Sequence, residues 1–144
     1  MINVKDILRS KAKGDVYTFT PDATVLAAIE LMAEKNVGSL LVLENDNLVG
    51  IITERDYSRK VILEGKSSTN TLVKEIMNQK LVVINPSTTI EECMALMIEN
   101  AVRYLPVIEE GRVIGVISMG NVVNTIISEQ NIVINNLQQY IMQG

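Results

Sequence analysis

The chain has 144 residues, of which 47% are hydrophobic and 3% aromatic, with a formal net charge of −4 and no histidine. This composition is typical of a globular protein with an aliphatic core, and the acidic balance argues against binding to nucleic acids or membrane surfaces, which requires a basic face. No segment has the roughly 20 apolar residues of a transmembrane helix, and the start lacks the apolar core of a signal peptide. The single Cys93 cannot form an internal disulfide, so we expect a cytoplasmic protein.

An internal repeat organises the chain. A shift of 65 positions aligns residues 16–62 with residues 81–127 without a gap, and 12 of the 47 aligned positions are identical. The identical pairs include Pro21 and Pro86, Thr24 and Thr89, and Gly50 and Gly115. The sequence therefore predicts two copies of one structural unit.

The elements of each unit follow one order. Segments with apolar residues at helical spacing alternate with short apolar runs, and turn residues separate these runs. This order predicts a β-α-β-β-α unit after a short helical start. Thr24 and Thr89 are expected to begin the longer helices, and Thr89 with Glu92 has the form of a capping box. The predicted segments are, in chain order, 4–8, 16–20, 25–32, 39–44, 48–53, 53–64, and then 73–77, 81–85, 90–98, 104–109, 113–118 and 118–129.

A further helix is predicted after the second repeat. Its apolar residues, Val133, Ile134, Leu137, Tyr140 and Ile141, share one helical stripe with Asn and Gln opposite. The stripe is explained either by packing on the chain's own domain or by a dimer contact. We favour the homodimer, because the two repeats already contain their own covering helices.

The ordered motifs resemble the cystathionine-β-synthase (CBS) domain, here as the tandem pair called a Bateman module. The resemblance rests on the helix starts TPDATV and NPSTTI, the strands VGSLLV and VRYLPV, and the turns GIITERD and GVISMGN. It implies an α/β (α+β) fold of two pseudo-twofold-related β-α-β-β-α repeats with packed sheets. The repeats would span residues 2–66 and 72–130, followed by a C-terminal helix at 131–144. The resemblance also implies two clefts between the repeats that hold adenosine nucleotides.

The turn GIITERD suits a nucleotide for physical reasons. Thr53 stands where a strand becomes a helix, so its hydroxyl and the first free N–H groups form an anion site. Asp56 lies on the same face, and its carboxylate is able to accept two hydrogen bonds from a ribose diol. Gly50 allows the strand to approach another backbone closely. The alternative is that Thr53 and Asp56 only cap a helix.

The resemblance extends the candidate ligand site to other positions. It implies that the strand after the first helix holds adenine and that Arg103 reaches a phosphate. Asn121 stands where the family usually has Asp, so the second cleft is expected to bind more weakly. The predicted ligand-binding residues are Thr18, Thr20, Val37, Gly38, Ser39, Leu40, Thr53, Arg55, Asp56, Arg103, Tyr104, Pro106, Ser118 and Asn121.

Catalysis is not expected. The chain lacks histidine, a glycine-rich phosphate loop and a cluster of metal ligands, and Cys93 lies mid-helix where a buried thiol is usual. We therefore expect a regulatory sensor of adenine nucleotides without catalytic cofactor or metal. AMP is the first choice of ligand, and ADP, ATP and NAD share its adenosine. The alternatives are a protein-interaction module with empty clefts and a sensor of S-adenosylmethionine. The sequence leaves the regulated protein unknown.

Overall fold

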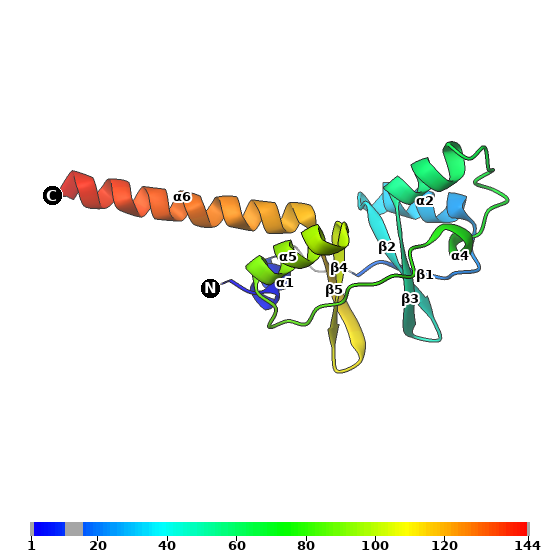
Figure 1. Ribbon diagram of the computed structural model, residues 1–144, viewed down its shortest axis with the longest axis horizontal. Helices are drawn as coiled ribbons and strands as arrows, with labels where there is room; N and C mark the ends of the chain where they lie inside the picture. Colours follow the sequence, from blue (N-terminus) through cyan, green and yellow to red (C-terminus); the bar gives the residue numbers. More distant parts are fainter. Residues whose placement is uncertain (1, 11–15, 144) are drawn as a thin grey trace.

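The structure is a computed structural model that describes residues 2–10 and 16–143, with Ser10 and Gln143 described by their backbone alone. The mixed α+β class with two small sheets and a C-terminal helix is confirmed (Figure 1). The bounds are α1 Val4–Ser10, β1 Thr18–Phe19, α2 Val25–Lys35, β2 Ser39–Glu44, β3 Asn47–Thr53, α3 Glu54–Tyr57, η1 Ser58–Ile62, α4 Val73–Ile76, α5 Ile90–Asn100, β4 Tyr104–Glu109, β5 Arg112–Ser118 and α6 Met119–Gln143.

The first repeat forms a sheet in the order β1-β2-β3. β1 runs parallel to β2, with Thr18 opposite Leu41, and β2 runs antiparallel to β3. The turn between β2 and β3 contains Asn45 and Asp46 with φ of 52° and 66°. Asn and Asp tolerate this left-handed backbone better than most residues, so the hairpin turns where the sequence predicts it.

The second repeat pairs β4 with β5 in the same antiparallel register. The predicted extended segment 81–85 makes only an isolated parallel bridge, with Ile84 opposite Val107. The helix starts agree with the prediction, because the hydroxyls of Thr24 and Thr89 accept hydrogen bonds from the third residue beyond, each at 3.2 Å. These caps fix the first residues of α2 and α5.

The two short leading helices pack against the opposite repeats. α1 precedes the first repeat, yet Val4 N donates to Thr88 O at 2.8 Å in the second. α4 precedes the second repeat, and Val73 N donates to Ala23 O at 2.8 Å in the first. The packing therefore crosses the linear division of the chain at residues 66 and 72, and each repeat is completed by a helix from the other side.

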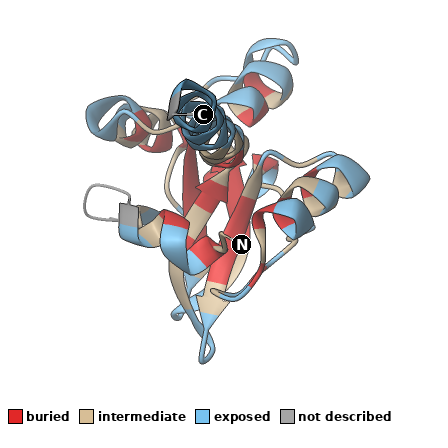
Figure 2. Cartoon of the chain, turned by 90° about the vertical axis from the view of Figure 1, so that its left-hand side faces the viewer, coloured by how far each residue is buried: buried red, intermediate tan, exposed pale blue. Residues whose placement is uncertain are grey.

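Two aliphatic cores result, one under each sheet, with the buried residues concentrated on the strands and on the inner helix faces (Figure 2). Each fully buried aliphatic side chain contributes roughly 1.5–3 kcal/mol. The first core contains Val25, Ala28, Met32, Leu40, Val42, Ile52, Val61, Val73 and Ile76. The second contains Val4, Ile7, Ile84, Ile90, Cys93, Met97, Leu105, Val107, Ile117 and Val122.

The last helix of each repeat differs from the sequence prediction. The predicted helix 53–64 is one α-helical turn, α3, that continues as the π-helical segment η1, where Leu63 N bonds to Ser58 O five residues back. The predicted helices 118–129 and 131–144 are instead one continuous helix, α6, which projects from the body (Figure 1). Within residues 2–10 and 16–143, no helix is long and apolar enough to cross a membrane.

Candidate functional site

A cleft of about 570 Å³ lies between the two repeats. Three segments form it: the turn from β3 into α3 and η1, the connection that follows α4, and the segment that runs from the end of α5 into β4. Its lining residues are Gly38, Ile51, Thr53, Glu54, Arg55, Asp56, Arg59, Lys60, Asn78, Lys80, Leu81, Val82, Asn100, Ala101, Val102, Arg103, Tyr104 and Pro106.

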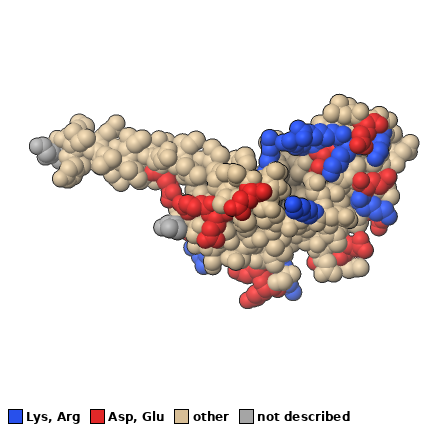
Figure 3. Space-filling model, in the orientation of Figure 1, with Lys and Arg blue, Asp and Glu red and all other residues tan. Residues whose placement is uncertain are grey.

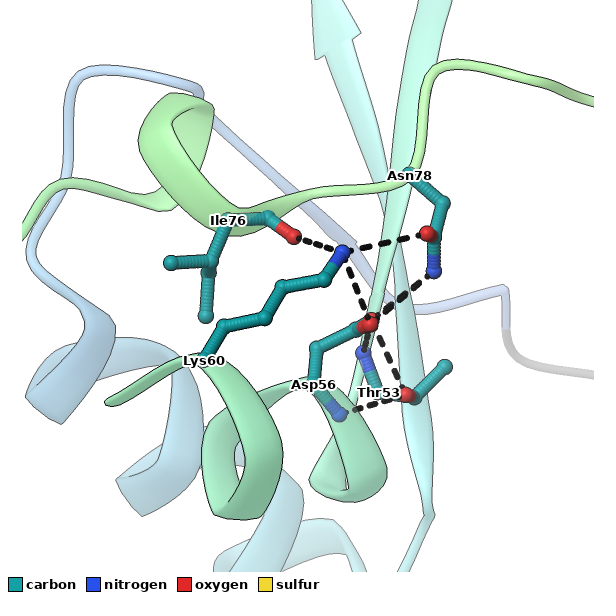
Figure 4. Close-up of polar contacts among 5 residues, drawn as sticks. All are labelled: Thr53, Asp56, Lys60, Ile76 and Asn78. Atoms are coloured by element: carbon teal, nitrogen blue, oxygen red, sulfur yellow. Dashed lines mark hydrogen bonds and ion pairs between the residues drawn. The ribbon is translucent and has the colours of Figure 1, made fainter. Parts of the chain in front are cut away.

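Thr53 and Asp56 form a capping box at the start of α3 (Figure 4). Asp56 Oδ2 accepts hydrogen bonds from the backbone N and from Oγ1 of Thr53, both at 2.9 Å, and Asp56 N donates to Thr53 Oγ1 at 3.1 Å. The interpretation as a helix cap is therefore correct. It leaves the predicted contact of Asp56 with a ribose untested, since Asp56 also lines the cleft.

Two further side chains engage the same carboxylate (Figure 4). Asn78 Nδ2 donates to both oxygens of Asp56 at 3.0 Å, and Lys60 Nζ forms an ion pair with Oδ1 at 3.2 Å. Lys60 Nζ also donates to Ile76 O at 2.9 Å and to Asn78 Oδ1 at 3.2 Å. The side chain of Asp56 is only 8% exposed, so this network provides the partners that a buried carboxylate requires.

Gly50 brings the connection after α4 close to this network. A Cβ at Gly50 would lie 2.6 Å from Met77 Sδ and 3.1 Å from Asn78 O, distances that a side chain does not tolerate without displacement. Asn78 N and O also pair with Ile51 O and N at 2.8 and 3.0 Å. The predicted close approach of another backbone at Gly50 is confirmed, and it positions Asn78 beside Asp56.

The cleft is basic although the chain is acidic. Arg55, Arg59, Lys80 and Arg103 line it, and among the residues that the structure describes none of them makes a salt bridge. Lys and Arg side chains crowd one edge of the body, whereas the projecting part of α6 is almost free of charge (Figure 3). Four unpaired cations, against Glu54 and an Asp56 that is ion-paired with Lys60, favour an anionic ligand.

Apolar and aromatic groups also line the cleft. Val82, Val102 and Pro106 line it together with Tyr104. Burial raises the pKa of the Tyr104 phenol, with a further contribution from the Glu54 carboxylate, while Arg103 lowers it. The phenol therefore stays protonated and able to donate a hydrogen bond at neutral pH. An apolar wall beside cations is suited to a planar base that carries phosphate.

The structure brings half of the predicted site residues together. Gly38, Thr53, Arg55, Asp56, Arg103, Tyr104 and Pro106 line the cleft. Val37 lies in an adjoining hollow of about 210 Å³, Ser39 and Leu40 are buried in β2, Thr18 and Thr20 are exposed at β1, and Ser118 and Asn121 lie outside the cleft at the start of α6.

The cleft combines segments of both repeats. Residues 102–106 occupy the place that residues 37–41 have in the first repeat, and they face the turn of the first repeat rather than that of their own. The sequence interpretation missed Arg59, Asn78 and Lys80 as lining residues. A detectable signal existed for Lys80, because basic residues precede the extended segment in both copies.

The turn of the second repeat carries a simpler cap. Ser118 N donates to Asn121 Oδ1 at 2.9 Å, and Asn121 N donates to Ser118 Oγ at 3.0 Å. No third side chain of the described residues bonds to the Asn121 amide. The two predicted turns thus share the capping geometry and differ in charge.

Groups suited to metal or thiol chemistry do not gather in the described part of the chain. No cluster of three or more Cys, Asp or Glu side chains there is arranged to hold a metal ion. Cys93 is fully buried in α5, and burial, with Glu92 nearby, raises its pKa to about 11. A thiol with this pKa is protonated at neutral pH and is a poor nucleophile.

Comparison with known proteins identifies the family of the chain. The CBS domain family matches residues 4–62 and 73–128. A mitochondrial CBS domain-containing protein of Arabidopsis thaliana is 40% identical over 98% of this chain and 72% of its own. The inosine-5'-monophosphate dehydrogenase of Methanocaldococcus jannaschii is 37% identical over 75% of this chain but only 21% of its own length.

A solved structure extends the agreement to three dimensions. The structure of a protein with CBS domains from Burkholderia ambifaria MC40-6 has a TM-score of 0.86 and 46% identity, and the match covers 90% of this chain and 96% of that one. The families matched are regulatory modules rather than catalytic domains. The chain therefore belongs to the CBS domain family and consists of a tandem pair of CBS domains.

Proposed function

We propose that this CBS pair is a sensor that binds an adenine nucleotide with at least one phosphate in the cleft between its repeats. The observation that carries the proposal is the set of four basic side chains, Arg55, Arg59, Lys80 and Arg103, that face one cleft without an acidic partner among the described residues. Unpaired cations around a cavity favour phosphate, which accepts charge-assisted hydrogen bonds. AMP is the simplest ligand of this class.

In the proposed complex the base lies on the apolar wall made by Val82, Val102 and Pro106. The phosphate then lies among the arginines and Lys80. The ribose faces Asp56, whose oxygens already accept from Asn78 and Lys60. A ribose hydroxyl has to replace one of the side-chain donors to Asp56, which also include Thr53 Oγ1, and replacement of Asn78 would couple binding to the connection that carries it.

Two other functions remain as alternatives. The first is a protein-interaction module whose cleft binds no nucleotide. The second is a sensor of S-adenosylmethionine, but a ligand without phosphate would leave the four cations unpaired. The dehydrogenase relative acts, by its name, on a purine nucleotide, which supports the nucleotide proposal for this chain. The cytoplasm is the proposed compartment, and the name of the plant relative, a mitochondrial protein, makes the mitochondrion the alternative.

Thermal unfolding tests the proposal. A ligand that binds only the native state stabilises it by RT ln(1 + [L]/Kd), about 2.7 kcal/mol at a hundredfold excess over Kd. AMP should raise Tm, adenosine should raise it less because it lacks phosphate, and GMP should have almost no effect. A larger shift with S-adenosylmethionine than with AMP would favour the second alternative, and no shift with any adenosine compound would favour the interaction module.

A further inference from the structure

Glu54 is an acidic residue without a partner in a cleft that is otherwise basic. It is the first residue of α3 and lines the cleft, and its side chain is exposed. Four cations line the same cleft, yet among the described residues the Glu54 carboxylate makes no salt bridge. A carboxylate near a phosphate weakens the binding of an anion by repulsion. Glu54 therefore favours a nucleotide only where it accepts a hydrogen bond from another part of that ligand.

Gly38 brings Glu54 next to Tyr104. Glu54 N donates to Gly38 O at 3.1 Å, which ties the start of α3 to the strand before it. A Cβ at Gly38 would lie 3.3 Å from Glu54 Oε1 and 2.5 Å from the Tyr104 hydroxyl. The missing side chain thus leaves room for both groups, and a carboxylate of the first repeat lies beside a phenol of the second.

Tyr104 adds a hydrogen-bond donor to this acceptor. Tyr104 and Pro106 share one face of β4, because side chains alternate along a strand, and both line the cleft. The phenol is half-buried, and burial and the Glu54 carboxylate raise its pKa, so it keeps its proton at neutral pH. Within the described part of the chain, neither the phenol nor the carboxylate has a hydrogen-bond partner. A free donor and a free acceptor therefore lie side by side near the apolar wall.

Adenine carries groups that match this pair. Its exocyclic amine is a hydrogen-bond donor, and a neighbouring ring nitrogen is an acceptor. Guanine and hypoxanthine have a carbonyl oxygen in place of the amine, and this oxygen is an acceptor. Because a carboxylate only accepts hydrogen bonds, Glu54 attracts the adenine amine and repels that carbonyl. In the second repeat Met119 aligns with Glu54, so its turn has no such acceptor.

We propose that Glu54 and Tyr104 recognise the edge of the base and make the cleft selective for adenine over bases with a carbonyl group in place of the amine. This assignment rests on the proposed nucleotide function. Glu54 accepts a hydrogen bond from the exocyclic amine, and Tyr104 donates one to the neighbouring ring nitrogen. The phosphate stays with the cations and the ribose with Asp56, so each part of the ligand has its own partners.

Calorimetric titration with AMP and with inosine monophosphate tests this recognition, because the two ligands differ only at this edge of the base. The parent should bind AMP about tenfold more tightly, since the carbonyl ligand loses a charge-assisted hydrogen bond. Glu54→Gln should bind the two ligands with similar affinity, because an amide both donates and accepts. The lost charge acts on both ligands alike and cancels in the ratio. The control Glu44→Gln, at the exposed end of β2 outside the cleft, should keep the ratio of the parent.

Tyr104→Phe tests the second contact and keeps the ring. It should bind AMP about fivefold more weakly, the effect of one neutral hydrogen bond, and its Tm without ligand should stay near that of the parent. Equal binding of AMP and inosine monophosphate by the parent would overturn the recognition and leave the nucleotide site in place. An unchanged ratio in Glu54→Gln, or unchanged AMP binding in Tyr104→Phe, would overturn it as well. A parent that binds neither ligand would overturn the proposed function and the recognition together.

Discussion

The two strand-to-helix turns, at Thr53–Asp56 and at Ser118–Asn121, come from one duplicated motif and have diverged in charge. Each has the same reciprocal bonds between a hydroxyl residue and the residue three positions later. Asp56, however, also binds Lys60 and Asn78, while the hydroxyl of Thr125, which aligns with Lys60, bonds among the described residues to Asn121 O alone. The cap is thus the inherited function of the motif, and the charged network is an addition of the first repeat.

The helices that follow differ in the same way. After Asp56 the helix widens into η1 and ends, and Lys60 lies in that segment and reaches Ile76 O in the connection between the repeats. After Ser118 the helix runs for 25 residues as α6. The first turn therefore faces a basic cleft, and the second starts an apolar arm. One motif has given one repeat a candidate ligand site and the other a candidate contact surface.

Removal of each capping side chain in turn should produce the largest difference in stability between the two turns. Asp56→Ala removes a cap and leaves Lys60 and Asn78 without their partner, so we expect a loss of about 2–3 kcal/mol in the free energy of unfolding. The loss is limited because Lys60 is 39% exposed and regains water. Asn121→Ala should cost about 1 kcal/mol, the value of a cap alone. Urea unfolding measures both, and equal losses would show that the network adds nothing.

Exchange of Asp and Asn between positions 56 and 121 should show how the charge of each turn affects its affinity for AMP. Asp56→Asn keeps the cap, as Asn121 does, but removes a charged acceptor, so AMP should bind about tenfold more weakly, a difference near 1.4 kcal/mol. Asn121→Asp should strengthen a weaker second binding event. Both changes are measured by calorimetric titration. If Asp56→Asn binds AMP as the parent does, the carboxylate serves only the fold.

The smallest expected effect is on the pH dependence of stability and concerns Cys93, which aligns with Ala28 in the first repeat. The pKa of the buried thiol is raised from 9.0 to about 11, so between these values the unfolded chain loses a proton that the folded chain keeps. Stability from this thiol is complete below pH 9 and decreases as the pH rises, by about 1 kcal/mol at pH 10. Cys93→Ala should remove this part of the alkaline loss in urea titrations. An identical pH dependence in both proteins would contradict the assigned burial.

The structural features that were predicted correctly depend on sequence patterns of short range. The repeat, the helix starts at Thr24 and Thr89, and the hairpins depend on residues close together in the chain, and all of them are observed. The exchange of α1 and α4 between the repeats was not predictable, because the local sequence of a short helix does not specify which of two cores it joins. The continuity of α6 was predictable, because no Gly or Pro separates the second repeat from the final stripe, but the interpretation treated the stripe as a separate helix.

The cleft was predicted only in part for a related reason. The sequence identified Thr53, Asp56 and Arg103 through their motifs, and all three line it. Asn78 and Lys80 belong to a polar connection without a motif, and they enter the cleft only because Gly50 lets that connection pass close to β3. A site formed between two repeats depends on long-range packing, which a pattern within one repeat does not contain.

Calorimetric titration of AMP into three proteins tests the central claim most directly, which is that the cations of the cleft bind a phosphate of an adenine nucleotide. The proteins are the parent, a Lys80→Ala, Arg103→Ala double variant, and the control Arg112→Ala, which changes an exposed arginine at the start of β5. Each lost charge-assisted bond is worth about 1.4 kcal/mol or more, so the double variant should bind about a hundredfold more weakly, and the control should bind as the parent does. A parent protein that binds no AMP, or a double variant that binds it as tightly as the control, would contradict the account.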